Sequence, residues 1–221
     1  MKKPNLTLVA LSLALCLSIT AKGEAPSSVT AEEALQTLMA GNQRFVRGHL
    51  SSVTPKELAQ RRAELVHGQK PFAIVLCCSD SRVGPEIVFD QELGNIFVVR
   101  TAGEVLDAAG IGSIEYAVAH LGSPLLVVLG HEHCGAVAAA VADAKEPGNI
   151  ADIVKAIRPA VKQSRELPGD PLANAIRANA LDIAARLRNT SPVISEQVKA
   201  GKLTVTAAVL SLKTGQVELL K

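Results

Sequence analysis

The sequence predicts a single α/β domain with a mainly parallel central β-sheet flanked by helices. Apolar runs typical of strands alternate along the chain with segments whose apolar residues recur at helical spacing. The first three runs contain almost no polar residues, as expected for strands that are covered on both faces. The chain has 221 residues, of which 48% are hydrophobic, and this is enough for one domain with a sizeable core.

Three buried strands are predicted at residues 72–77, 96–99 and 125–129. A fourth strand, 203–210, alternates partly because of its threonines, which favours a place nearer an edge of the sheet. Residues 217–220 are predicted to add a short last strand after a turn.

Helices are predicted before, between and after these strands. The first begins after Thr30, because Glu33 follows it at the spacing of a capping box. The other predicted helices span residues 51–66, 112–121, 135–144, 150–165, 171–188 and 192–200.

Residues 1–23 are predicted to be a secretory signal peptide. A short positive start precedes an uncharged, mostly apolar run, and small residues follow at Ala21 and Gly23. The run is shorter than the roughly 20 residues of a membrane span, although an uncleaved anchor remains an alternative. Residues 24–221 then form the folded domain, which we expect to be exported to the periplasm with no further attachment to the membrane.

The remaining composition narrows the class of protein. The chain has 23 basic and 21 acidic residues, with none of the strong positive charge typical of a nucleic-acid-binding protein. The domain keeps Cys77, Cys78 and Cys134, an odd number that does not suggest a disulfide framework. A bridge between the two adjacent cysteines is disfavoured, since their Cα atoms lie only about 3.8 Å apart. Metal ligation explains at least two of the three better.

Two clusters of reactive side chains follow buried strands. Residues 78–82 (Cys-Ser-Asp-Ser-Arg) follow the first strand, and residues 131–135 (His-Glu-His-Cys-Gly) follow the third. Ligands of open parallel sheets bind beyond the carboxyl ends of the strands, so the two clusters can meet in space. Thiolate and imidazole are preferred ligands of Zn²⁺, and three protein ligands with an open fourth position are typical of a catalytic site.

The residues Cys78, His131 and Cys134 supply such a ligand set. His133 is the alternative imidazole, but its neighbour Cys134 makes chelation of one ion by both geometrically poor. Cys77 precedes Cys78 in an extended strand and points to the opposite face, so we expect it in the core. Taken singly, each cysteine could be an ordinary buried residue, and the combination at two strand ends is what favours a metal.

The two clusters resemble the signature of the β-class carbonic anhydrases. The resemblance runs from about Ala31 to the C-terminus, and its further motifs are Gly41–Phe45, Pro85–Asp90, Phe97–Arg100 and Gly130-His131. It implies one Zn²⁺ per subunit on Cys78, His131 and Cys134. One departure is Glu104, where many members carry asparagine.

The resemblance also implies an activity and further roles. The reaction is the reversible hydration of carbon dioxide to bicarbonate and a proton, with Asp80 and Arg82 as a catalytic dyad. Asp80 is also a candidate fourth zinc ligand in a closed, inactive state. The residues that match a plant-like substrate pocket are Gln69, Phe97, Tyr116 and Gly135. Members of the family commonly form homodimers or higher homo-oligomers.

Two alternative functions remain at this point. A related zinc hydrolase of the same fold acts on another small linear molecule, carbon disulfide. A zinc-binding protein without catalysis would be expected to lack the dyad, and here both dyad residues are present.

Overall fold

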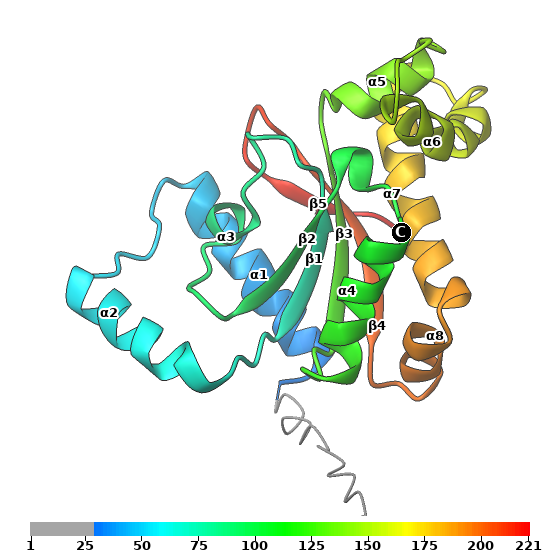
Figure 1. The fold of residues 1–221 in the computed structure, drawn as a ribbon. Coiled ribbons are helices and arrows are strands. Elements are labelled where there is room, and N and C mark those ends of the chain that lie inside the picture. The colour runs from blue at the N-terminus through cyan, green and yellow to red at the C-terminus, as the bar shows by residue number, and fades with distance from the viewer. Residues whose placement is uncertain (1–28) are drawn as a thin grey trace, which may run out of the picture.

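The strands are β1 (Ala73–Cys77), β2 (Ile96–Arg100), β3 (Leu125–His131), β4 (Thr204–Leu210) and β5 (Val217–Leu219). In the computed structural model, which describes residues 29–221, they form one sheet in the order β2-β1-β3-β4-β5 (Figure 1). Neighbouring strands are parallel except for β5, which pairs antiparallel with β4. The predicted α/β fold with a mainly parallel sheet is confirmed. The predicted signal peptide lies outside the described residues.

The helices are α1 (Ala31–Val46), α2 (Pro55–Glu64), α3 (Pro85–Val88), α4 (Ala108–Ala119), α5 (Gly135–Val141), α6 (Ile150–Ser164), α7 (Pro171–Thr190) and α8 (Pro192–Lys199). Two short 3-10 turns are η1 (Leu65–His67) and η2 (Ala102–Glu104). None of the helices within residues 29–221 is both long enough and apolar enough to cross a membrane.

Alternate residues of the central strands enter two different cores. Ile74 and Leu76 of β1 pack with α4, α7 and α8 on one face of the sheet. Val75 and Cys77 of the same strand pack with α1 and α3 on the other face. This is the period of two that an extended chain requires, and it places Cys77 in the core as expected. The helices α5 and α6 form a third core beside Cys78 and Cys134.

Local capping explains where several helices begin. Thr30 and Glu33 form a reciprocal capping box at α1, and Thr54 and Glu57 form another at α2. The helix predicted at 112–121 begins earlier, at Ala108, because the Asp107 side chain accepts a hydrogen bond from a backbone N–H of the first turn. Glycine has a low helix propensity, so the glycines in that turn argued against a helix beginning there. The short helix α3 was not predicted, since four residues show no periodicity.

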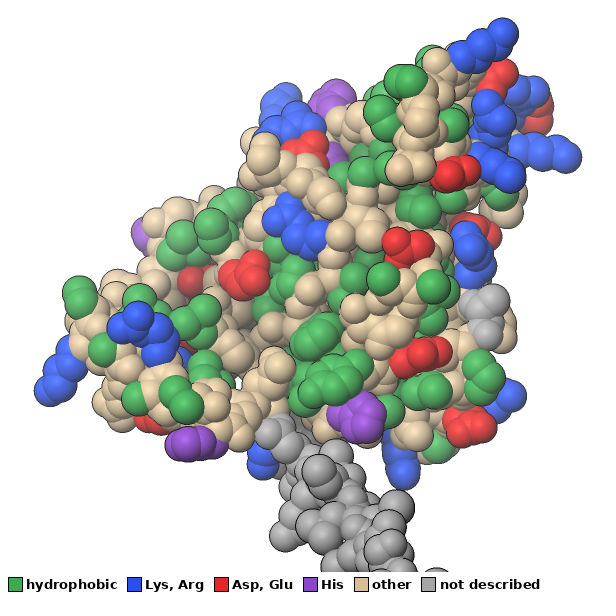
Figure 2. Space-filling model, viewed as in Figure 1, with side chains coloured by type: hydrophobic (Ala, Val, Ile, Leu, Met, Phe, Trp, Pro, Cys, Tyr) green, Lys and Arg blue, Asp and Glu red, His purple; other side chains and the backbone are tan. Residues whose placement is uncertain are grey.

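The helix α2 stands apart from the rest of the domain. It has no buried residue, and Figure 1 shows it reaching away from the sheet. Exposed apolar side chains nevertheless lie on it and beside it, among them Val53, Leu58 and Val66. Figure 2 shows hydrophobic side chains on this lobe. A helix with apolar side chains and no buried face is typical of a surface that is covered by a partner.

A buried amide ties the N-terminal helix to the last strand. Asn42 of α1 donates from Nδ2 to the carbonyls of Val88 (3.1 Å) and Gly215 (2.8 Å). Its Oδ1 accepts from the backbone N–H of Val217 at 2.9 Å. We expect Asn42→Ala to lower the free energy of unfolding by about 2–3 kcal/mol, because a buried N–H and two carbonyls lose their partner.

Urea unfolding followed by circular dichroism measures this loss. The control is Gln36→Ala, an exposed position on the same helix, where a change within about 0.5 kcal/mol is expected. Equal stability of the two variants would contradict the role given to Asn42.

Candidate metal centre

The sheet brings the two predicted clusters together at its carboxyl edge. The strands β1 and β3 are neighbours, with Cys77 opposite Leu129, so Cys78 follows β1 beside the end of β3. His131 was expected just after the third strand but is its last residue, since Gly130 and His131 still pair with β4. Cys134 lies at the N-cap of α5, three residues further on.

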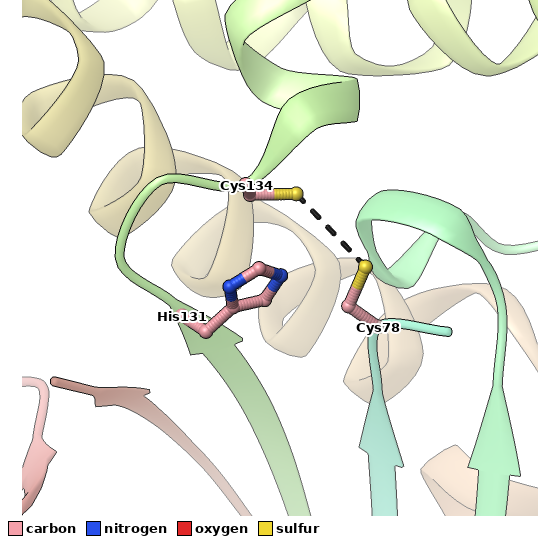
Figure 3. Close-up of side chains that lie close together, drawn as sticks. All are labelled: Cys78, His131 and Cys134. Carbon is pink, nitrogen blue, oxygen red and sulfur yellow. Dashed lines mark hydrogen bonds between the residues drawn. The ribbon is translucent and has the colours of Figure 1, made fainter. Parts of the chain in front are cut away.

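The three side chains face one another across a small gap (Figure 3). One ligand atom from each of Cys78, His131 and Cys134 lies within 4.8 Å of the others, and all three residues are buried. The two Sγ atoms are 4.0 Å apart. Two sulfurs bound to one tetrahedral zinc at about 2.3 Å each would be separated by about 3.8 Å. The spacing of the sulfurs therefore fits a zinc ion.

The histidine is oriented for ligation by a backbone carbonyl. Nδ1 of His131 donates to the carbonyl of Glu132 at 2.8 Å, which fixes the proton on Nδ1. Nε2 is buried and has no hydrogen-bond partner among residues 29–221. A buried ring nitrogen with a free lone pair is costly unless a ligand satisfies it. The orphaned Nε2 is the second observation that fits a metal at this position.

The two thiols share a proton when no metal is bound. The pKa of Cys78 is lowered, chiefly because Cys134 donates its S–H to the Cys78 sulfur. Cys134 correspondingly holds its proton and its pKa is raised. The backbone N–H of Gly103 also donates to Cys78 Sγ, at 3.3 Å. A bound zinc displaces the shared proton, because the metal takes thiolates as ligands.

The predicted dyad lies beside these ligands. Arg82 donates from Nε to Asp80 Oδ1 (2.9 Å) and from a terminal nitrogen to Oδ2 (2.7 Å). This fork holds the pKa of Asp80 well below its usual range. Asp80 Oδ2 is also 3.9 Å from Nε2 of His131. The carboxylate thus lies next to the open side of the ligand cluster and is kept there, ionised, by Arg82.

The predicted pocket residues are not all gathered at this edge within one chain. Gln69 is exposed in the loop before β1, so the roughly 16 Å length of that strand separates it from Cys78. Phe97 lies three residues, about 10 Å, before the carboxyl end of β2. Its ring centroid is 6.5 Å from that of Tyr116 on α4, which is 49% exposed. Gly135 directly follows Cys134, and the space that a Cβ would occupy there is open.

Comparison with known proteins identifies the family. A family model described as carbonic anhydrase matches residues 73–217. The chain belongs to this family. A protein named carbonic anhydrase 2 from Mycobacterium tuberculosis is 42% identical over 187 residues, which cover 83% of this chain and 89% of the relative. A carbonic anhydrase from Mycolicibacterium smegmatis is 40% identical, covering 84% and 91%.

Solved structures agree on the β class. The β-carbonic anhydrase CcaA has a TM-score of 0.67 and 27% identity, with 85% of this chain and 95% of that chain covered. A β-carbonic anhydrase from Sordaria macrospora shares the fold with a TM-score of 0.65 and 24% identity, over 85% and 93%. Carbonic anhydrases are lyases, and this chain is such an enzyme. The β class uses zinc, and Cys78, His131 and Cys134 are candidate ligands.

Sequence reasoning missed one feature of this carbonic anhydrase site. Arg100, at the end of β2, donates to the carbonyls of Cys78 (3.0 Å) and Asp80 (2.7 Å). It therefore holds the backbone of the loop that carries both a candidate ligand and the dyad carboxylate. Its position at the carboxyl end of a strand next to β1 was a signal that could have identified it. His133 lies in the turn before Cys134, with φ +54 and an exposed side chain.

Without zinc, the two candidate thiolate ligands are expected to oxidise together. Their sulfurs are 4.0 Å apart. Cys78, whose pKa is lowered, is the thiolate that attacks the Cys134 sulfur when the disulfide forms. Dissolved oxygen accepts the two electrons, together with the one proton that the pair shares and a second proton from solvent, and leaves as hydrogen peroxide. Chelated protein kept in air should lose two thiols in a thiol titration, and zinc with a reductant should restore activity where zinc alone does not. Zinc-loaded protein in the same air is the control; full recovery with zinc alone would contradict the prediction.

Proposed function

We propose that Cys78, His131 and Cys134 hold one zinc ion, and that Asp80 and Arg82 complete the catalytic site. The reaction of the family is the reversible hydration of carbon dioxide to bicarbonate and a proton. The observation that carries the assignment is the buried, unpartnered Nε2 of His131, which faces two cysteine sulfurs and the dyad carboxylate. Bound zinc would lower the pKa of a coordinated water from 15.7 to about 7 and so supply a nucleophile at neutral pH.

The protein's own groups then orient the reaction. Asp80 accepts a hydrogen bond from the attacking oxygen, which fixes the direction of its remaining lone pairs. Arg82 keeps the carboxylate ionised and turned toward the site, because its two donors match the two oxygens. Without the hydrogen bonds from Arg82, Asp80 would be free to move closer to the ligand cluster and act as a fourth ligand of the zinc. The dyad is thus proposed to keep the site open as well as active.

The substrate pocket is proposed to form between two copies of the chain. Gln69 lies at the end of β1 opposite to Cys78 and follows the exposed elements α2 and η1, which supports a role in the site of a partner and not in its own. The edge strand β2 has one unpaired side, and Phe97 and Tyr116 beside it remain partly exposed. Figure 2 shows hydrophobic side chains gathered next to α4. A homodimer would bury these surfaces and supply an apolar wall for carbon dioxide.

The location of the enzyme is proposed to be the periplasm. The support is the sequence of residues 1–23, with its positive start, apolar run and small residues at the cleavage site. Cleavage would leave the domain at 24–221.

Stopped-flow hydration of carbon dioxide with a pH indicator tests the proposed function on purified, zinc-loaded protein. We expect acceleration over buffer between about pH 6 and pH 9, rising toward the basic side as the nucleophile is deprotonated. The absence of acceleration at every pH in that range would contradict the proposal. Turnover on carbon disulfide, measured on the same sample, should be negligible beside that on carbon dioxide.

A further inference from the structure

The turn η2 combines several unfavourable features next to the candidate metal centre. Two consecutive residues, Gly103 (φ +66) and Glu104 (φ +55), have left-handed backbone conformations. Glu104 is not a residue that adopts this conformation readily. Its carboxyl group is buried, and Oε1 has no hydrogen-bond partner within the described part of the chain. Strain and an unpaired buried oxygen persist where the surrounding structure imposes them, and such places are often functional.

One buried amide on α7 imposes this conformation. Nδ2 of Asn179 donates to the carbonyl of Gly103 at 2.9 Å and to Oε2 of Glu104 at 3.3 Å. It therefore binds both the backbone and the side chain of the turn. From the other side, the turn is closed by α5 and α6, since a Cβ on Gly103 would lie 2.7 Å from Ile157 and 3.1 Å from Ala136. The turn has no room to move away from Asn179.

The consequence of this clamp is a hydrogen bond to a candidate zinc ligand. The N–H of Gly103 points at Cys78 Sγ, 3.3 Å away. A hydrogen bond to a thiolate withdraws charge from the sulfur, so the sulfur donates less to a bound metal. A metal that receives less charge is a stronger Lewis acid. The left-handed turn sets the direction of the Gly103 N–H. This direction therefore influences how much charge the Cys78 sulfur donates to a bound metal.

We propose that Asn179 and Glu104 are positioning residues that hold the Gly103 N–H against Cys78 and so tune the thiolate as a zinc ligand. The inference rests on the proposed function, because it assumes a metal on Cys78. Neither residue contacts substrate in this proposal. Burial raises the pKa of Glu104 well above its usual range, and the neighbouring Cys78 raises it further.

The test compares variants by two measurements that respond to the thiolate. The first is the pH midpoint of carbon dioxide hydration with zinc. The second is the thiolate-to-metal charge-transfer absorption of the protein loaded with Co²⁺, which needs no catalysis. In Asn179→Ala and Glu104→Ala, we expect the midpoint to move to higher pH, with roughly twofold to fivefold lower kcat/KM on the acid limb. The cobalt band should move to longer wavelength, because the sulfur regains charge.

Two further variants separate positioning from stability. Glu104→Gln keeps an oxygen that accepts from Asn179, so its midpoint and band should remain at the wild-type values. Asn42→Ala removes an equally buried amide with bonds to backbone carbonyls, but on the opposite face of the sheet. It should lower stability and change neither measurement. If Asn179→Ala does not fold, the comparison of Glu104→Ala with Glu104→Gln tests the proposal alone.

The outcomes that would overturn the proposal are distinct. Unchanged midpoint and band in both alanine variants would show that the clamp is only structural. A shift in Asn42→Ala of the same size would assign the effect to general loss of stability. A shift in Glu104→Gln as large as in Glu104→Ala would assign it to the ionisable proton and not to the contact. Absence of any thiolate band in the wild-type cobalt protein would instead overturn the proposed metal site.

Discussion

Cys78→Ala is expected to abolish zinc binding, whereas Cys77→Ala, one residue away, leaves one zinc per chain. The side chains of the two cysteines point to opposite faces of the sheet. Cys78 Sγ lies within the candidate ligand cluster, and Cys77 packs with Val75 against α1 and α3. Loss of one of three ligands leaves His131 and Cys134, too few to hold a catalytic zinc. We expect carbon dioxide hydration by Cys78→Ala to fall by about three orders of magnitude or more.

The adjacent variant is a matched control because both changes remove one thiol from a buried position. Cys77→Ala should cost about 1 kcal/mol of stability from lost packing and leave turnover near the wild-type value. Zinc content by atomic absorption, thiol titration and stopped-flow hydration measure the difference. Full zinc stoichiometry in Cys78→Ala, or loss of zinc from Cys77→Ala, would refute the ligand assignment.

Arg82→Met is expected to lower kcat/KM roughly a hundredfold to a thousandfold while zinc content stays at one per chain. In the proposed site, its guanidinium fork orients Asp80 and keeps it from the metal. The pH dependence has a definite sign. Arg82 holds the pKa of Asp80 below its usual range, and its loss lets that pKa return toward about 3.9. Asp80 is ionised at pH 6 to 9 in both proteins, so the loss of activity should be uniform there.

The control for this variant is Arg177→Met. Arg177 also forks onto a carboxylate, with bonds of 2.8 and 2.9 Å to Glu218, and its side chain is 43% exposed against 53% for Arg82. Neither Arg177 nor its partner Glu218 belongs to the ligand cluster or the dyad, so the loss of Arg177 should leave hydration unchanged. If Arg82→Met lost activity only at acidic pH, Asp80 would act through its titration and not through its orientation.

Much of this molecule can be predicted from its sequence because its central strands β1 and β3 are buried on both faces. The strand β2, expected to be equally buried, is an edge strand with half-buried residues. Runs such as 72–77 and 125–129 have no polar residue to satisfy, and that pattern is local. The candidate ligands were also predictable, because cysteine and histidine follow two such runs and the parallel topology aligns the strand ends. The proposed roles of Asp80 and Arg82 followed from the family resemblance.

The rest depends on contacts that no local pattern encodes. Asn179 lies in the middle of a helix, and its partner Glu104 is 75 residues away in the chain. The spacing of apolar residues along α7 does not distinguish this buried amide from one exposed to solvent. The start of α4 depended on a single cap at Asp107, in a turn whose glycines argue against a helix. The placement of Gln69 required the three-dimensional position of α2, a helix with no buried residue.

The separation of the candidate ligands along the chain has one more consequence. Cys78 and Cys134 are 56 residues apart, on segments that meet only when β1 and β3 are paired. An ion held between them acts as a removable cross-link that closes a long loop, and it binds the folded chain far better than the unfolded one. With the proposed ligands, free zinc is therefore expected to raise the stability of the folded enzyme as well as to supply its activity. We expect the chain to become more resistant to heat and proteases when it acquires the proposed metal.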